Sequence, residues 1–162
     1  MRGVICNTSP LQYLYQTDLL HLLPTLFESA QVPPAVAAEL AEGKRHGIRL
    51  PELAEISWIT VRSVRDRTLL PLVANLGNGE KEVLALGMET PGHLLVLDDR
   101  NARRYANAAG LESTGTLGIL VLAKERGVIE TVRPILDHLQ DMQFRVDAAT
   151  REMVLDMAEE PH

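Results

Sequence analysis

The sequence has little cysteine and lacks the long apolar runs of a membrane protein. Its one cysteine, Cys6, cannot form an internal disulfide, and no CxxC pair is present for zinc binding or redox chemistry. We expect Cys6 to be a small buried residue. The longest apolar runs fall far short of the roughly 20 residues that span a bilayer, and the N-terminus lacks the apolar stretch of a secretory signal. The sequence thus predicts a cytoplasmic protein without a membrane span.

An excess of basic residues is also absent. The formal net charge is -6, whereas domains that coat nucleic acid by bulk electrostatics are usually strongly basic. Any contact with RNA must therefore be local. The acidic excess has two explanations at this stage, ordinary solubility and a carboxylate metal site.

The usual nucleotide-binding and hydrolase motifs are missing as well. The sequence contains no GxxxxGK(S/T), GxGxxG or GxSxG pattern, which removes the simplest NTPase and serine-hydrolase interpretations. Gly77-Asn78-Gly79 is interpreted as a turn rather than a phosphate-binding loop. The histidines share no zinc-ligand spacing and are expected to be surface or packed residues. They are His21, His46, His93, His138 and His162.

What the sequence has is an alternation of short apolar segments and amphipathic segments. With 46% hydrophobic residues and no linker or repeat, residues 1–162 are expected to form a single domain. Strands are predicted at residues 4–7, 30–32, 58–61, 93–97 and 111–113. Helices are predicted at residues 10–14 with Ser9 as N-cap, and at 19–26, 34–40, 69–76, 80–89, 100–109, 116–126, 133–140 and 147–157, with a basic loop at 43–49. This order predicts an α/β fold with a mainly parallel central sheet flanked by helices.

Polar residues follow three of the predicted strands at their carboxyl ends, where ligands bind in open α/β sheets. These segments are Asn7-Thr8-Ser9, Asp98-Asp99 and Thr114-Gly115-Thr116. Asp98 directly follows an apolar run, and a carboxylate there is costly unless it has a partner or a ligand. The functional site is therefore predicted at these strand ends.

Two predicted helices add carboxylates close to their apolar faces. Glu39 follows Val36 by three residues, and Glu80 precedes Val83 and Leu84 at the spacing of one helical face. Both glutamates are expected to point inward. Oxygen ligands from Asp, Glu, Asn and Ser, without His or Cys, suit Mg²⁺ or Mn²⁺.

Each of these residues also has a purely structural interpretation. Asp99 is well placed to cap the helix that begins at Arg100. Glu80 and Glu82 lie in a first helical turn, where the helix dipole favours acidic side chains. A solvated position would explain Glu39 equally well, and the polar segment after the first strand is consistent with a simple helix N-cap.

Five segments in this order resemble a branch of the PIN-domain family that is related to VapC-type toxins. They are NTSPL at residues 7–11, PAVAAEL at 34–40, LGNGEKE at 76–82, LDDRNAR at 97–103 and TGTL at 114–117. The similarity extends to Gly127 and to Phe144-Arg145-Val146, so it covers nearly the whole chain. No single motif is specific, and the ordered set carries the resemblance.

The resemblance implies acidic residues that converge at the strand ends, bind Mg²⁺ or Mn²⁺ and hydrolyse RNA phosphodiesters. The first-strand acid of the family falls on Asn7, the helical Glu on Glu39 and the late strand-end acid on Asp98. The next acid falls on Glu80 or Glu82. Glu80 is favoured because it lies on the apolar face of its predicted helix. Supporting positions are Ser9, Glu82, Asp99 and Thr116. Many family members carry Asp where this sequence has Asn7, so the site loses one negative charge and its metal affinity should fall.

Two functions are predicted on this basis. The first is a divalent-metal-dependent endoribonuclease, and the resemblance implies a toxin with a small antitoxin partner and a homodimer. Its RNA phosphate contacts are predicted at Lys44, Arg45, Arg49, Arg100, Arg103 and Arg104, although solvated side chains are the ordinary state of such residues. The alternative is a catalytically weak PIN-fold module that binds protein or RNA without cutting it, which Asn7 and the acidic charge favour. A metal-dependent phosphatase is the least supported, because no phosphatase nucleophile motif is present.

Overall fold

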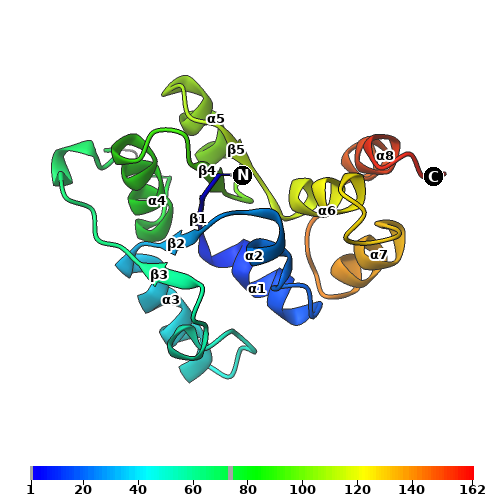
Figure 1. The fold of residues 1–162 in the computed structure, drawn as a ribbon, viewed down its shortest axis with the longest axis horizontal. Coiled ribbons are helices and arrows are strands. Elements are labelled where there is room, and N and C mark those ends of the chain that lie inside the picture. The colour runs from blue at the N-terminus through cyan, green and yellow to red at the C-terminus, as the bar shows by residue number, and fades with distance from the viewer. Residues whose placement is uncertain (1, 73–74) are drawn as a thin grey trace.

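A parallel sheet forms the centre of the molecule (Figure 1). The computed structural model describes residues 2–72 and 75–162. Within these residues the sheet has five strands in the order β3-β2-β1-β4-β5, and every neighbouring pair is parallel. The strands are β1 (Val4–Cys6), β2 (Ala30–Val32), β3 (Ile59–Val61), β4 (Leu94–Val96) and β5 (Ser113–Thr114). The predicted α/β fold with a parallel central sheet is confirmed.

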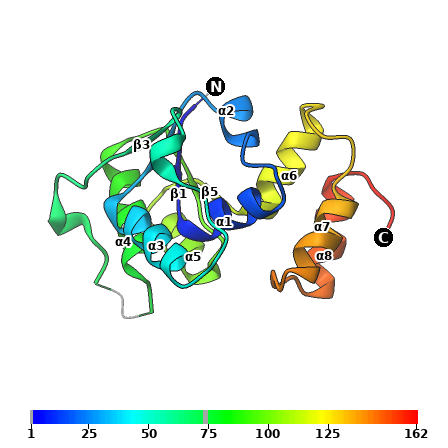
Figure 2. The same cartoon turned by 90° about the horizontal axis from the view of Figure 1, so that it is seen from below.

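Helices cover both sides of the sheet. Those in the described residues are α1 (Thr8–Gln16), α2 (Leu22–Leu26), α3 (Pro34–Arg45), α4 (Asn78–Glu89), α5 (Arg100–Ala108), α6 (Thr116–Glu125), α7 (Arg133–Asp141) and α8 (Ala148–Met157). Two 3-10 turns are also present, η1 (Leu53–Glu55) and η2 (Arg67–Leu69). Figures 1 and 2 show α3 and α4 together on one side and α2 with α6 on the other. The α7–α8 hairpin lies outside α6 and contacts it through α8.

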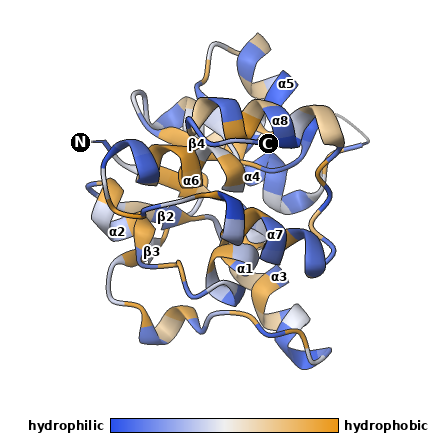
Figure 3. Ribbon diagram, turned by 90° about the vertical axis from the view of Figure 1, so that its right-hand side faces the viewer, coloured by the Kyte–Doolittle hydropathy of each residue, from blue (hydrophilic) through white to orange (hydrophobic). Residues whose placement is uncertain are grey.

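Burial explains why the short strands hold together. Every residue of β1 and β4 is buried, and Cys6 is 1% exposed, as predicted. Burial raises the pKa of the Cys6 thiol to about 12, so the thiol stays protonated and inert. In Figure 3 the hydrophobic colouring follows the central strands and α6. These residues belong to one core cluster that unites both helical layers with the sheet.

The register of the sheet sets its carboxyl end. Val4 pairs with Leu94 and Cys6 pairs with Val96, so β1 and β4 end side by side. The Asn7 backbone N–H then donates to the Val96 carbonyl at 3.0 Å. The first residues beyond the two strands, which carry the predicted site, therefore lie at the same edge.

Several predicted boundaries are wrong at helix starts. Helix α1 begins at Thr8, so the N-cap position is Asn7 and Ser9 lies inside the first turn. Gly77 is the N-cap of α4, and Asn78 and Gly79 are helical rather than a turn. In both places the helix starts directly where the chain reaches the sheet edge. Gly79 has an ordinary helical backbone, and its lack of a side chain avoids a clash with Glu39 and Asn7.

Other boundaries differ as well. Helix α3 continues to Arg45, so the predicted basic loop at 43–49 begins in a helix, and its last turn carries Lys44 and Arg45. The predicted helix at 69–76 is wrong where it is described, because only η2 reaches residue 69, while residues 73–74 lie outside the described residues. Strand β5 lies at 113–114 instead of 111–113.

The C-terminal hairpin is fixed by an aromatic contact and an ion pair. Phe144 meets the Tyr13 ring of α1 edge-on, with 4.8 Å between ring centroids. Glu160 pairs with Lys124 of α6 at 2.9 Å and accepts the backbone N–H groups of Val132 and Arg133. Among the helices of the described ranges, none has the length and apolar character needed to cross a membrane.

Candidate functional site

The first turn of α1 connects two distant carboxylates at the carboxyl end of the sheet. The Thr8 hydroxyl donates to Glu39 Oε2 at 2.9 Å, and the Ser9 hydroxyl donates to Asp98 Oδ2 at 2.8 Å. The two hydroxyls are neighbours in sequence, whereas the carboxylates come from α3 and from the end of β4. The turn that follows β1 therefore organises the site.

Glu39 is held from its other side by α4. Its Oε1 accepts the backbone N–H of Gly79 at 3.1 Å. Gly79 lies in the first turn of α4, where N–H groups have no partner within the helix and the dipole favours a negative charge. Both oxygens of this exposed residue thus have a donor. Glu39 is thus solvent-exposed, as its structural interpretation predicts, while its carboxylate is also oriented by two donors.

Asp98 has the densest set of donors. Besides Ser9, the Thr116 backbone N–H donates to Oδ1 at 2.7 Å and the Thr116 hydroxyl donates to Oδ2 at 2.8 Å. Thr116 is fully buried. The Arg103 guanidinium contacts the carbonyls of Leu97 and Asp98 at 2.9 and 2.7 Å and fixes the backbone there. The cost of a carboxylate after an apolar strand is therefore offset by three direct donors.

Glu80 is the candidate carboxylate whose pKa is raised by its surroundings. Partial burial raises the pKa of Glu80 above the ordinary value of a glutamate, the Gly77 N–H bond at 2.8 Å opposes the shift, and repulsion from Asp99 and Glu39 adds to it. The last two causes place Glu80 in the same negatively charged surroundings as Glu39. Its bond to the Gly77 N–H also caps the start of α4.

Asn7 supplies an oxygen that nothing in the described structure satisfies. The residue is 7% exposed, and its Oδ1 is buried without a hydrogen-bond partner. A β-carbon built on Gly79 would lie 3.0 Å from this oxygen. A buried amide oxygen without a donor is costly and is often explained by an unseen water or cation. The Asn7 oxygen, with the carboxylates of Glu39 and Glu80, fits Mg²⁺ or Mn²⁺, which take oxygen ligands and keep several waters.

A complete all-carboxylate centre is not formed. Across residues 2–72 and 75–162, no three Asp, Glu, His or Cys side chains are gathered closely enough to hold a metal ion. The amide of Asn7 takes one ligand position, and hydroxyls and backbone N–H groups occupy Asp98. Any ion at this site must therefore rely on few carboxylates.

The second-choice residues have separate structural roles. Glu82 accepts the Ala35 N–H at 3.0 Å and pairs with Arg67 at 3.1 Å, so it joins α4 to the start of α3. Asp99 accepts the Ala102 N–H at 2.9 Å and is the N-cap of α5, as the structural interpretation predicts. Glu80 lies in the first turn of α4, and repulsion from Glu39 is among the causes that raise its pKa.

The predicted phosphate-binding residues fall into two groups. Lys44 pairs with Glu52, Arg45 with Glu42, and Arg49 with Asp18 at 3.4 Å. Their charges are thus balanced locally. The second group is on α5, where Arg103 binds backbone carbonyls while Arg100 and Arg104 are exposed.

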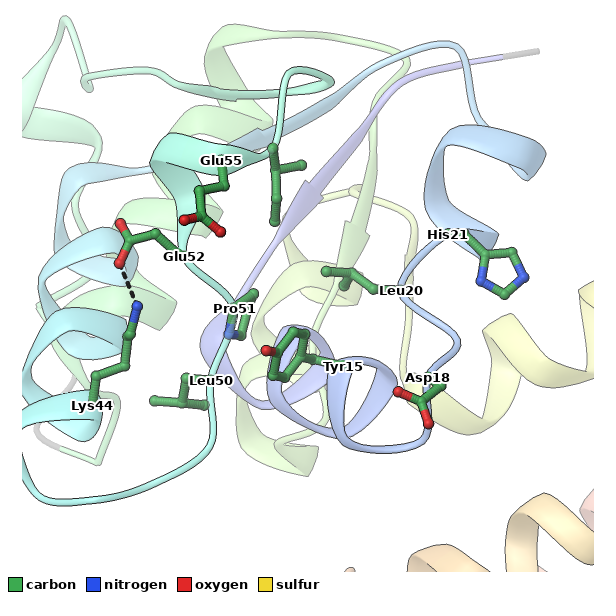
Figure 4. Close-up of a pocket in the computed structure, with 10 residues that line it drawn as sticks. Tyr15, Asp18, Leu20, His21, Lys44, Leu50, Pro51, Glu52 and Glu55 are labelled. Atoms are coloured by element: carbon green, nitrogen blue, oxygen red, sulfur yellow. Dashed lines mark hydrogen bonds and ion pairs between the residues drawn. The ribbon is translucent and has the colours of Figure 1, made fainter.

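A hollow of about 640 Å³ lies away from this site, beside the end of α1 (Figure 4). Its walls come from Tyr15, Asp18, Leu20, His21, Lys44, Leu50, Pro51, Glu52, Glu55 and Ile56. A second hollow of about 420 Å³ is lined by Arg2, Leu26, Phe27, Leu94, Leu122 and Arg126. None of the candidate ligand residues lines either hollow, so neither hollow locates the chemistry.

Two residues of the site were missed from the sequence. Thr8 was visible only as part of a polar strand end, although its hydroxyl holds Glu39. Gly79 was interpreted as part of a turn, although it donates to Glu39 and lies against Asn7. A glycine directly before Glu80 in a first helical turn was the available signal.

Comparison with known proteins gives one consistent result. The family model described as PIN domain matches residues 3–160. A PilT N-terminus domain protein from the hyperthermophilic archaeon Sulfolobus solfataricus P2 is 16% identical, with a TM-score of 0.52 over 75% of this chain and 92% of that chain. The PIN domain endonuclease Utp24 is 16% identical, with a TM-score of 0.51 over 70% of this chain and 84% of that chain. Among curated proteins, none matches significantly. At these identities the structural similarity shows the PIN-domain fold.

Proposed function

This chain belongs to the PIN-domain family, and on that premise we propose that it is a divalent-metal-dependent endoribonuclease. The single observation that carries the proposal is the buried, unpaired Oδ1 of Asn7 beside the Glu39 carboxylate. A hard cation such as Mg²⁺ or Mn²⁺ would satisfy this oxygen, as no donor of the described residues does.

The roles of the side chains follow from their contacts. Asn7, Glu39 and Glu80 would hold the ion, which when bound lowers the pKa of water and polarises a phosphate. Asp98 orients the first turn of α1 against α6 through its bonds to Ser9 and Thr116, and it contributes negative charge. Thr8 and Gly79 keep Glu39 pointed at the site.

Substrate contact is proposed on α5. Arg100 and Arg104 are exposed on the helix that begins just after Asp98. Lys44, Arg45 and Arg49 already have acidic partners, so releasing them would cost an ion pair. Single-stranded RNA is the proposed substrate, and its phosphates would first meet α5.

We also propose partners for this chain, a small antitoxin protein and a second copy of itself. Similarity to VapC-type toxins supports a small antitoxin and a homodimer in the cytoplasm. A catalytically weak interaction module is the second candidate, because Asn7 removes a charge from the ligand set. The two candidates differ in one result, the cleavage of RNA.

The test is cleavage of mixed single-stranded RNA with Mn²⁺ by the wild type, Glu39→Gln and Asp98→Asn. The matched control is Glu55→Gln, which removes a carboxylate from the hollow of Figure 4. We expect cleavage by the wild type and control, its loss with EDTA, and a loss of at least about 100-fold in both site variants. Absence of cleavage in the wild type would overturn the enzyme and favour the interaction module.

A further inference from the structure

The missing side chain of Gly79 leaves a space at the centre of the candidate site. A β-carbon there would lie 3.0 Å from Asn7 Oδ1, 3.1 Å from Glu39 Cδ and still closer to Glu39 Oε1. The nearest atoms are all side-chain atoms of Glu39 and Asn7, so alanine cannot be accommodated without moving the Glu39 carboxylate. We call it the Gly79 space, bounded by Gly79 Cα, Asn7 Oδ1 and Glu39 Oε1.

Three independent features meet at the Gly79 space. Asn7 Oδ1 is buried and unpaired. Glu39 Oε1 is fixed in place by the Gly79 N–H, and its other oxygen is fixed by Thr8. Gly79 itself is buried and has an ordinary helical backbone, so conformational freedom does not explain a glycine there. Glycine is also less favourable than alanine within a helix, so helix formation does not explain a glycine there.

We propose that Gly79 is a positioning residue that determines cation binding, because its lack of a side chain lets the Glu39 carboxylate lie beside the Asn7 oxygen, where both can share one ion. The inference rests on the proposed metal dependence and adds a residue with no oxygen ligand of its own to the site. The backbone N–H of Gly79 orients the Glu39 carboxylate, and the absence of a β-carbon leaves room for that carboxylate beside Asn7. Glu82, three residues further along α4, instead holds α4 against α3 and does not bound this space.

The Gly79→Ala variant tests the role of the space. Its matched control is Gly43→Ala, which adds the same methyl to helix α3 and crowds only the end of the Leu50 side chain. Calorimetric titration of the metal-free proteins with Mn²⁺ should show binding weakened about tenfold or more in Gly79→Ala, as for losses of groups that orient metal ligands. Gly43→Ala should bind as the wild type does.

A second measurement does not depend on the variant folding. In a Mg²⁺ titration of the ¹⁵N-labelled wild type, the Gly79 amide signal should be among those that shift most, since its N–H partner is Glu39. A Gly79 signal that stays fixed while others shift overturns the proposal. So does equal Mn²⁺ binding by Gly79→Ala and the wild type, and in that case the proposed metal dependence stands. A wild type that binds neither ion overturns both.

Discussion

The carboxyl-end site and the hollow of Figure 4 show two ways in which acidic residues occur in this protein. At the carboxyl end, Glu39 and Asp98 are held by hydroxyls and backbone N–H groups, with no basic side chain bonded to them. In the hollow, Glu52 and Asp18 are paired with Lys44 and Arg49. Neutral donors orient a carboxylate without cancelling its charge, whereas ion pairs cancel it.

This difference decides which region can attract a cation. A carboxylate bonded to Lys or Arg has its charge balanced locally, and a divalent ion would have to compete with that partner. The carboxylates of Glu39 and Asp98 lack such a partner among the described residues, and the pKa of Glu80 is raised chiefly by burial, with repulsion from Asp99 and Glu39 adding to the shift. The larger hollow is therefore the weaker candidate for metal chemistry, although it offers more room.

The largest effect on stability is expected when Asp98, the carboxylate with the most hydrogen-bond donors, is removed. In Asp98→Ala the buried N–H and hydroxyl of Thr116 lose their acceptor, which should cost roughly 3 kcal/mol. For a domain of this size the Tm should fall by roughly 6–12 °C. Scanning calorimetry in EDTA measures the change.

The matched variant in the other region is Glu52→Ala. Its ion pair with Lys44 is about half exposed, so the Tm should stay close to that of the wild type. Equal losses of stability in both variants would contradict the distinction between oriented and paired carboxylates.

Much of the fold was predictable because its signals are local. The apolar run at 94–97 and the Gly and Pro residues around it predict β4, and the alternation of strands with helices predicts the parallel sheet. Starts of helices were less predictable at Thr8 and Asn78, where the chain enters a helix directly beneath the sheet edge. There, contacts with residues far away in sequence fix the first turn.

The site was predictable in its residue types but not in its bonding. Strand ends and apolar helix faces indicate Asn7, Glu39, Glu80 and Asp98. That Ser9 and Thr116 share Asp98 depends on the distance between α1 and α6, which no sequence spacing encodes. The pairing of Lys44, Arg45 and Arg49 with acids was also missed, because any charged loop residue is consistent with solvation.

A smaller effect is expected when Asn7 is replaced by Asp, because the change adds one negative charge to the site. Asn7→Asp adds a carboxylate at a buried position next to Glu39, so Mn²⁺ should bind on the order of tenfold more tightly. Without metal the same change should lower stability by on the order of 1 kcal/mol, because the new charge has no cationic partner. Calorimetric titration and melting in EDTA measure the two effects.

The control for Asn7→Asp is Asn78→Asp, which adds the same charge at an exposed position in the first turn of α4. It should change neither Mn²⁺ binding nor metal-free stability to a comparable extent. Tighter Mn²⁺ binding without RNA cleavage would leave the metal site intact and favour the interaction module.

The smallest expected effect concerns Glu80 and depends on pH. Its pKa in the folded protein is raised above 4.5, chiefly by burial, so folding favours the protonated form. The contribution of this group to stability is therefore fully present below the unfolded-state pKa and is lost as the pH rises through the folded-state pKa. Glu80→Gln is uncharged throughout, and its amide oxygen can still accept the Gly77 N–H.

In EDTA, Glu80→Gln should thus melt above the wild type at pH 7 and level with it below pH of about 4. Because Glu80 is only partly buried, the difference should stay under about 4 °C, which corresponds to about 1 kcal/mol. Millimolar Mn²⁺ should reverse the order at pH 7, since the ion stabilises only the protein that keeps the carboxylate. A melting difference that is constant from pH 4 to 8, or unchanged by Mn²⁺, would mean that Glu80 does not share the charged site of Glu39.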